Sequence, residues 1–182
     1  RNEKRKLVMT DAANAYVRFS KTCNGHPESL RLATNIFLVI ADFEEAAAAA
    51  AEFIALQPLN DNAYFLRAVA YDRGNDPKKA IDDYIAAIEL FQPKARIADV
   101  SYIGLAKSYD KVGRPCDAAL AIESWVALNP ILNDTARARA VISGYEKKGA
   151  CIDPVSGTED VFSIRRLGGG VIIVPVTVNG VK

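Results

Sequence analysis

The feature of this sequence that most constrains its fold is an internal repeat. Three aromatic residues, Phe37, Tyr71 and Tyr109, lie 34 and then 38 residues apart. Three alanines keep the same two spacings: Ala46, Ala80 and Ala118. Self-similarity at a period of roughly 20 to 50 residues is typical of stacked repeat proteins, in which each unit packs on its neighbours. The chain is therefore predicted to contain three copies of one supersecondary unit.

Each unit is predicted to be a pair of amphipathic helices. The units are assigned to residues 27–58, 61–93 and 99–130. In the second unit, Tyr64, Ala68 and Tyr71 fall on one face at helical spacing. A Gly-Asn-Asp-Pro turn follows, and Pro77 suits the first turn of the next helix, where its missing N–H is not needed. Pro93 ends the unit, because proline interrupts a helix.

This pattern resembles the tetratricopeptide repeat. The third unit fits the family in register from Tyr102 onward, with Gly113 at the turn and Trp125 where alanine is usual. The first unit departs more, with Ala41 where glycine is usual and Phe53 where alanine is usual. The resemblance implies a mainly α solenoid of about three helix-turn-helix repeats. Stacked repeats need atypical end helices to cover the last apolar faces, and segments 11–21 and 134–148 are predicted to provide them.

Beyond the repeats the composition changes. Segment 150–160 has turn residues and no period, so it is predicted to be a linker. Val171 to Val178 is rich in β-branched residues, and Asn179-Gly180 is a strong hairpin signal. The predicted organisation is an N-terminal helix in 1–26, repeats plus a capping helix in 27–149, the linker, and a short C-terminal β-hairpin segment in 161–182.

Catalytic, metal and cofactor chemistry has little support in the sequence. The single histidine, His26, lies in a predicted loop, which favours a solvated side chain. The cysteines lack the close pair spacing that zinc sites use. Asp82-Asp83 and Glu44-Glu45 are interpreted as charged helix faces. We therefore predict no catalytic residue, no metal and no cofactor in this chain.

The net charge and the hydropathy limit the classes of partner that can be expected. The net charge of +1 gives no global field for nucleic acid or membranes, and the basic residues between Arg1 and Lys6 are interpreted as a solvated end. The longest apolar run, 36–41, is far shorter than the roughly 20 residues that span a bilayer. The chain does not begin with Met, so we expect that a native N-terminus with any targeting signal precedes it.

Two of the three cysteines are placed so that they could meet. Cys116 starts the second helix of the third unit, and Cys151 follows the next helix. In an up-and-down stack these points lie at the same end of the layer, so a Cys116–Cys151 disulfide is possible, with Cys23 free; buried thiols are the alternative. A bridge would favour an oxidising compartment, so the expected location is periplasmic or otherwise exported, with the cytoplasm as the alternative.

The tetratricopeptide resemblance also implies a binding surface. Such stacks bind extended peptides or helices in a concave groove lined by the first helix of each pair. By register, these groove residues are Asn62, Phe65, Val69, Asp72 and Arg73 in the second unit, and Val100, Ile103, Lys107, Asp110 and Lys111 in the third. The expected partner is another protein or peptide, or another part of the same polypeptide.

The tail carries a second resemblance. The run Val174 to Lys182 is similar to the opening hairpin of retropepsin-like aspartic proteases, including the bacterial group. In that family the turn leads directly into Asp-Thr-Gly, but this chain contains neither Asp-Thr-Gly nor Asp-Ser-Gly. The two aspartates that would share a proton and activate water are thus absent, and this chain alone is predicted to be inactive.

Two hypotheses about function remain open at this stage. In the first, the chain is the non-catalytic interaction region of a larger aspartic protease, and it recruits substrate or positions or dimerises the protease. In the second, it is a free-standing peptide-binding adaptor with no enzymatic role. The codons after Lys182 would distinguish them, because the protease hypothesis requires Asp-Thr-Gly shortly downstream.

Overall fold

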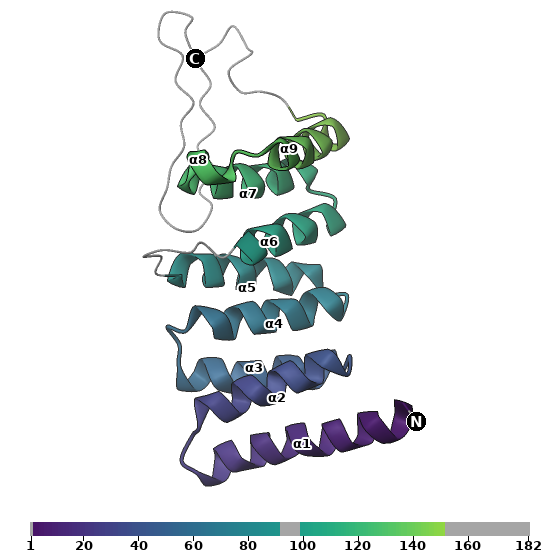
Figure 1. The fold of residues 1–182 in the computed structure, drawn as a ribbon, viewed down its shortest axis with the longest axis vertical. Helices are drawn as coiled ribbons and strands as arrows, with labels where there is room; N and C mark the ends of the chain where they lie inside the picture. Colours follow the sequence, from purple (N-terminus) through teal and green to yellow (C-terminus); the bar gives the residue numbers. More distant parts are fainter. Residues whose placement is uncertain (1, 92–98, 152–182) are drawn as a thin grey trace, which may run out of the picture.

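The computed structural model describes residues 2–91 and 99–151, and every regular element within them is a helix (Figure 1). The helices are α1 (Asn2–Thr22), α2 (Pro27–Val39), α3 (Phe43–Leu56), α4 (Asp61–Arg73), α5 (Pro77–Leu90), α6 (Asp99–Lys111), α7 (Pro115–Leu128), α8 (Pro130–Asn133) and α9 (Ala136–Gly149). The predicted β-hairpin segment 161–182, and all but the start of the linker, lie outside the described residues.

The helices stack one on the next in chain order. Figure 1 shows this stack from α1 at one end to α9 at the other. Three antiparallel pairs, α2–α3, α4–α5 and α6–α7, coincide with the three sequence repeats, and from α1 to α8 each helix packs on the next along the chain. α9 packs on α7 as the first helix of a further unit would, and the short α8 lies between them in the sequence.

The turn inside each pair needs one residue in the left-handed region. That residue is Ala41 in the first pair (φ 59°), Asn75 in the second (φ 65°) and Gly113 in the third (φ 75°). Glycine and asparagine adopt this conformation readily, while alanine pays for it in strain. The equivalent residue therefore sits one position after Gly74, which the sequence had indicated as the turn residue.

Both end helices differ from their predicted bounds. α1 begins at Asn2 rather than near Asp11, so Lys4, Arg5 and Lys6, which were expected in a solvated end, belong to a helix. Their side chains are exposed along it, and lysine and arginine are good helix formers. At the other end, α9 begins two residues later than predicted, after the unpredicted α8.

Two hydrophobic clusters hold the stack together. One lies between α1 and α4 and contains the fully buried Phe37, and the other lies between α4 and α7 and contains the fully buried Leu105. Phe65 and Val69 on α4 pack against both clusters. Burying side chains of this size contributes about 1.5–3 kcal/mol each, so the inter-pair contacts fix how the pairs sit on one another.

Candidate protein-interaction surface

The first helices of successive pairs form a continuous layer. α4 contacts α2 on one side and α6 on the other, in addition to its own partner α5. The ten residues predicted from the register lie on two of these adjacent helices, α4 and α6, and we call this set the first-helix face: Asn62, Phe65, Val69, Asp72, Arg73, Val100, Ile103, Lys107, Asp110 and Lys111. The structure thus brings side chains more than 30 residues apart onto neighbouring helices.

Two ion pairs tie this layer together at equivalent points of the repeat. The Lys111 ammonium on α6 donates to the Asp72 carboxylate on α4 at 2.7 Å and to the Asp72 carbonyl oxygen at 3.1 Å. Asp110, which is the next repeat's counterpart of Asp72, accepts from Lys148 on α9. Half-exposed ion pairs contribute up to about 1 kcal/mol, and here they mainly set the spacing of the first helices. Asp72, Asp110 and Lys111 thus already form ion pairs within the chain.

The apolar part of the face divides into buried and available residues. Phe65 and Val69 are partly buried in the core clusters, and the ring centroid of Phe65 lies 6.2 Å from that of Tyr84. Val100 and Ile103, in contrast, are 52% and 38% exposed. Exposed β-branched side chains one helical turn apart offer a partner a small hydrophobic anchor point. Val100 and Ile103 are therefore the apolar contacts that this face makes available.

Two cations on the face have no ion-pair partner among the described residues. Arg73 ends α4 and Lys107 lies in the middle of α6, and both side chains are exposed. Asn62, near the start of α4, is partly buried and polar. The available groups are therefore positive and apolar, which is the mixture that peptide-binding surfaces commonly present.

Tyr84 lies beneath this layer and stays neutral. Burial raises the pKa of its phenol well above the ordinary value, and the nearby Asp72 carboxylate raises that pKa further, while Arg73 opposes the shift. Its ring reaches Gly104 on α6, where a Cβ would lie 2.4 Å from Tyr84 Cζ. Tyr84 therefore acts as a spacer between α5 and α6.

A buried ion pair escaped the sequence analysis. Asp83, interpreted there as part of a charged helix face, is 5% exposed and accepts two hydrogen bonds from Arg67, at 2.7 and 2.8 Å. The Arg67 guanidinium lies 5.8 and 6.0 Å from the ring centroids of Tyr64 and Tyr71. The hydrogen-bonded carboxylate raises the pKa of Arg67 above its already high value. The sequence did carry a signal for this burial, because the helical period places Asp83, like Tyr84, on the inner face of α5.

His26 has a local structural role. Its Nδ1 accepts a hydrogen bond from the Ser29 backbone N–H at 3.2 Å, so it caps the start of α2. The imidazole also lies edge-on to Phe19, with the ring centroids 5.4 Å apart. Capping satisfies one of the free N–H groups at a helix start. Within residues 2–91 and 99–151, no cluster of three or more His, Cys, Asp or Glu side chains could hold a metal ion.

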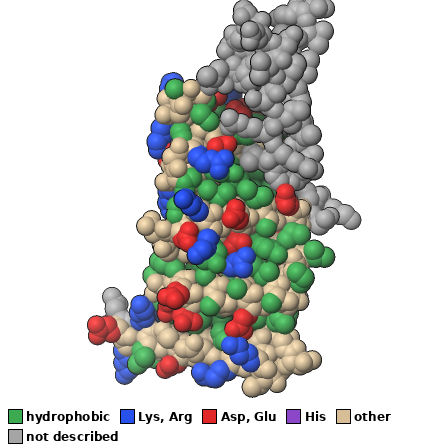
Figure 2. All heavy atoms as spheres, turned by 180° about the vertical axis from the view of Figure 1, so that it is seen from behind, with side chains coloured by type: hydrophobic (Ala, Val, Ile, Leu, Met, Phe, Trp, Pro, Cys, Tyr) green, Lys and Arg blue, Asp and Glu red, His purple; other side chains and the backbone are tan. Residues whose placement is uncertain are grey.

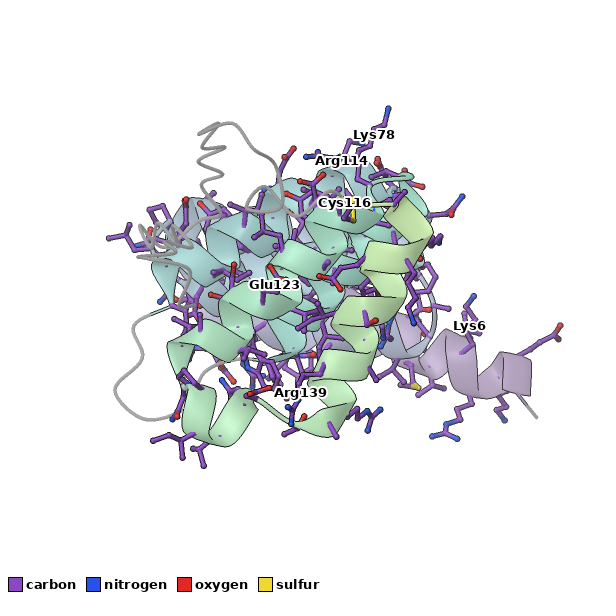
Figure 3. All side chains as sticks on the ribbon, turned by 90° about the horizontal axis from the view of Figure 1, so that it is seen from above. Lys6, Lys78, Arg114, Cys116, Glu123 and Arg139 are labelled. Carbon is purple, nitrogen blue, oxygen red and sulfur yellow. A yellow bond between two sulfur atoms is a disulfide. The ribbon has the colours of Figure 1, made fainter. Side chains whose placement is uncertain are left out.

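A disulfide closes the far end of the stack. The sulfur atoms of Cys116 and Cys151 are 2.11 Å apart and the Cα atoms 5.6 Å, and Cys23 is a free, exposed thiol. Figure 3 shows Cys116 beside the end of α9, with Lys6 on the part of α1 that extends beyond the rest of the stack. The bridge joins the start of α7 to the second residue after α9, so it holds the last two long helices together.

One side of the stack, seen from behind the view of Figure 1, is mixed in character. Figure 2 shows acidic and basic side chains there, interspersed with apolar patches. None of the described helices is long and apolar enough to cross a membrane. Such a surface suits contacts with proteins better than binding to a uniformly charged polymer.

Comparisons with known proteins support the fold. No family model matches the sequence, and no curated protein matches it at a significant level. Two solved structures of MamA are similar: one has a TM-score of 0.65 and 23% identity and covers 81% of this chain and 78% of its own. The other has a TM-score of 0.60 and 22% identity, with coverage of 81% and 91%. At this identity the likeness concerns the fold alone. Together with the 34- and 38-residue spacings and the paired helices, it supports a tetratricopeptide-type fold for the described part of this chain.

Proposed function

We propose that this chain is a protein-interaction adaptor that binds a polypeptide segment on the first-helix face. The observation that carries the proposal is that α4 and α6 lie side by side and present Val100, Ile103, Arg73 and Lys107 without partners among the described residues. Side chains of this kind on a rigid, preorganised layer give affinity without the entropic cost of ordering the surface.

The chemistry of these four residues indicates the partner. An apolar side chain would contact Val100 and Ile103, and carboxylates would pair with Arg73 and Lys107. The partner segment is therefore expected to combine hydrophobic and acidic residues, in an extended or helical conformation. Asp72, Asp110 and Lys111 would support the surface through their ion pairs to neighbouring helices and would not contact the ligand directly.

Peptide selection on the full chain tests this function. Peptides are selected by phage display, and binding of the enriched sequences is measured on variants by fluorescence anisotropy. Ile103→Asp and Lys107→Glu should each weaken binding about 10-fold or more, as expected for anchor residues. Glu89→Lys, an exposed change on α5, is the matched control and should leave binding unchanged. Enriched peptides that bind all of these variants equally would refute the proposal.

An association with a protease is a second, less favoured candidate. It rests on the hairpin-like sequence around Asn179-Gly180, which lies outside the described residues. In that case the first-helix face would recruit substrate, or the protease part would dimerise the protein. An Asp-Thr-Gly triplet in the reading frame after Lys182 would support this candidate, and a stop codon there would eliminate it. The likeness to MamA concerns the fold, and it fits the adaptor at least as well as it fits a region attached to a protease.

A further inference from the structure

A hollow opens on a different surface from the first-helix face. It has a volume of about 550 Å³ and lies between α3 and the C-terminal end of α4. Ala47, Ala48 and Ala51 of α3 form one wall, and Tyr71 of α4 contributes to the other. We call this feature the alanine hollow. None of the residues that line the hollow belongs to the first-helix face, although Tyr71 and Gly74 flank two of its members, Asp72 and Arg73, in the sequence.

The repeat explains why this space is empty. At an offset of 34 residues, the counterparts of Ala47 and Ala51 on α5 are Ile81 and Ile85. Ile81 is 7% exposed and Ile85 packs against the second core cluster, so the isoleucines fill the equivalent space in the next unit. The first unit has methyl groups there instead. The hollow therefore comes from specific residues, and restoring the isoleucines should close it.

The rim of the hollow is acidic. Three carboxylates contribute to it: Asp42, Glu44 and Asp76. Asp76 pairs with Lys79 at 2.9 Å, whereas Asp42 and Glu44 form no ion pair with any described residue. Asp42 precedes α3 but its side chain makes no capping hydrogen bond. Two negative charges are thus left uncompensated beside an apolar wall.

The aromatic wall already attracts cations. The Lys79 ammonium lies 5.3 Å from the Tyr71 ring centroid, and the Arg67 guanidinium carbon lies 6.0 Å from it. Such distances are within the range of cation–π attraction. The Tyr71 ring is thus an aromatic wall of the kind that cations approach.

We propose that the alanine hollow binds an arginine side chain of a partner polypeptide. The aliphatic stem would lie along the alanine methyl groups, and the guanidinium would pair with Asp42 and Glu44 near the Tyr71 ring. Arginine fits better than lysine, since its planar and weakly hydrated guanidinium stacks on aromatic rings and pairs with carboxylates in a bidentate manner. The volume of the hollow is within the usual range of roughly 300–1,000 Å³ for ligand sites, so it admits the side chain with adjoining backbone.

A small probe tests the chemistry directly on the full chain. N-acetyl-arginine amide is titrated against protein labelled with ¹³C at the alanine methyl groups, and methyl shifts are followed by NMR. We expect saturable shifts at Ala47, Ala48 and Ala51 with a dissociation constant of about 1–10 mM, as suits one anchoring side chain. N-acetyl-citrulline amide has nearly the same shape without the charge, and it should produce no saturable shift.

Variants then locate the site. Ala47→Ile with Ala51→Ile should abolish the arginine shifts by filling the hollow. Asp42→Asn with Glu44→Gln should weaken binding about 3- to 10-fold, the sum expected for two half-exposed charge pairs. Glu89→Gln, which removes an exposed charge elsewhere, should leave the arginine shifts unchanged. If the isoleucine variant fails to fold, the change in arginine affinity of the Asp42→Asn with Glu44→Gln variant tests the location of the site.

Four results would overturn the proposal. Citrulline could bind as well as arginine, the dissociation constant for arginine could be unchanged in the charge variant, or the shifts could map to the first-helix face around Ile103. Absence of any saturable shift up to about 50 mM would do the same, since that corresponds to less than about 2 kcal/mol of binding.

Discussion

Arg67 on α4 holds Asp83 on α5 through two parallel hydrogen bonds, and the Asp83 side chain is only 7% exposed. This pair lies inside the central unit of the stack, between helices that face each other along their whole length. Both ends of the guanidinium fork are used, so the pair fixes the sliding and rotation of α4 relative to α5.

Removing one partner of this pair should be costly. Asp83→Asn leaves the partly buried Arg67 without its counter-charge, and we expect a loss of about 2–4 kcal/mol in the free energy of unfolding, measured by urea denaturation. The neighbouring Asp82→Asn is the control, because Asp82 is exposed and should change stability by less than about 0.5 kcal/mol. Similar losses for both variants would show that the buried pair has no special role.

The glycine in α6 is required by Tyr84. In Gly104→Ala the new methyl group would lie 2.4 Å from Tyr84 Cζ and 2.7 Å from its hydroxyl oxygen, so the two helices must move apart. We expect a loss of about 1–3 kcal/mol in thermal or urea unfolding, as is usual for overpacking. In Gly144→Ala on α9 no heavy atom would lie within 4 Å, so this control should gain up to about 1 kcal/mol from helix propensity.

The repeated turns offer a gain in stability. Ala41 has a φ of 59° at the position where Gly113 has 75°, so Ala41→Gly should relieve strain and raise the free energy of unfolding by about 1 kcal/mol. The reverse change, Gly113→Ala, should lower it by a similar amount. No heavy atom lies within 4 Å of the position of its new Cβ, so only the backbone conformation is tested. A stabilised Gly113→Ala variant would contradict this account.

The sequence predicted the helix pairs because the repeat shows directly in the spacing of Phe37, Tyr71 and Tyr109. It placed the residues of the first-helix face on α4 and α6 because the register of one helix places all its side chains, and their role as a binding groove stays a prediction. It missed the burial of Asp83, since charged residues are rarely inside and the pairing with Arg67 depends on two helices meeting. It also missed the alanine hollow, because an unfilled space between helices depends on packing across units, whereas Ala47 and Ala51 by themselves are good helix formers.

The contact between α7 and α9 should depend on pH through Glu123. Burial raises the pKa of the Glu123 carboxyl above its ordinary value, and the nearby Glu146 carboxylate raises it further. The folded state therefore binds the proton of Glu123 more tightly than the unfolded state does. The contribution of protonated Glu123 to the free energy of unfolding is full at low pH and is lost as the pH rises through the folded-state pKa.

Replacing Glu123 by a neutral side chain tests the direction of this pH dependence. Glu123→Gln should raise the free energy of unfolding at about pH 7, where the charge is buried at a cost, and should have little effect at about pH 4, where the carboxyl is mostly protonated in both states. The exposed Glu89→Gln serves as the control and should show no such difference between the two pH values. Destabilisation by Glu123→Gln at neutral pH would mean that the carboxylate makes a favourable contact instead.

The disulfide sets the stability of the end of the stack and bears on where the protein works. It closes a segment between residues 35 positions apart, so its loss in Cys116→Ser with Cys151→Ser should lower the free energy of unfolding by about 2–4 kcal/mol. Cys23→Ser, which removes the exposed free thiol, should leave stability within about 0.5 kcal/mol.

Alkylation of the denatured protein followed by mass measurement counts the thiols: only Cys23 should react without reductant, and all three cysteines should react after reduction. We propose on this basis that the chain works in an oxidising compartment, because such bridges persist there. Reaction of all three thiols without reductant, in protein isolated from its native compartment, would contradict both the bridge and the exported location.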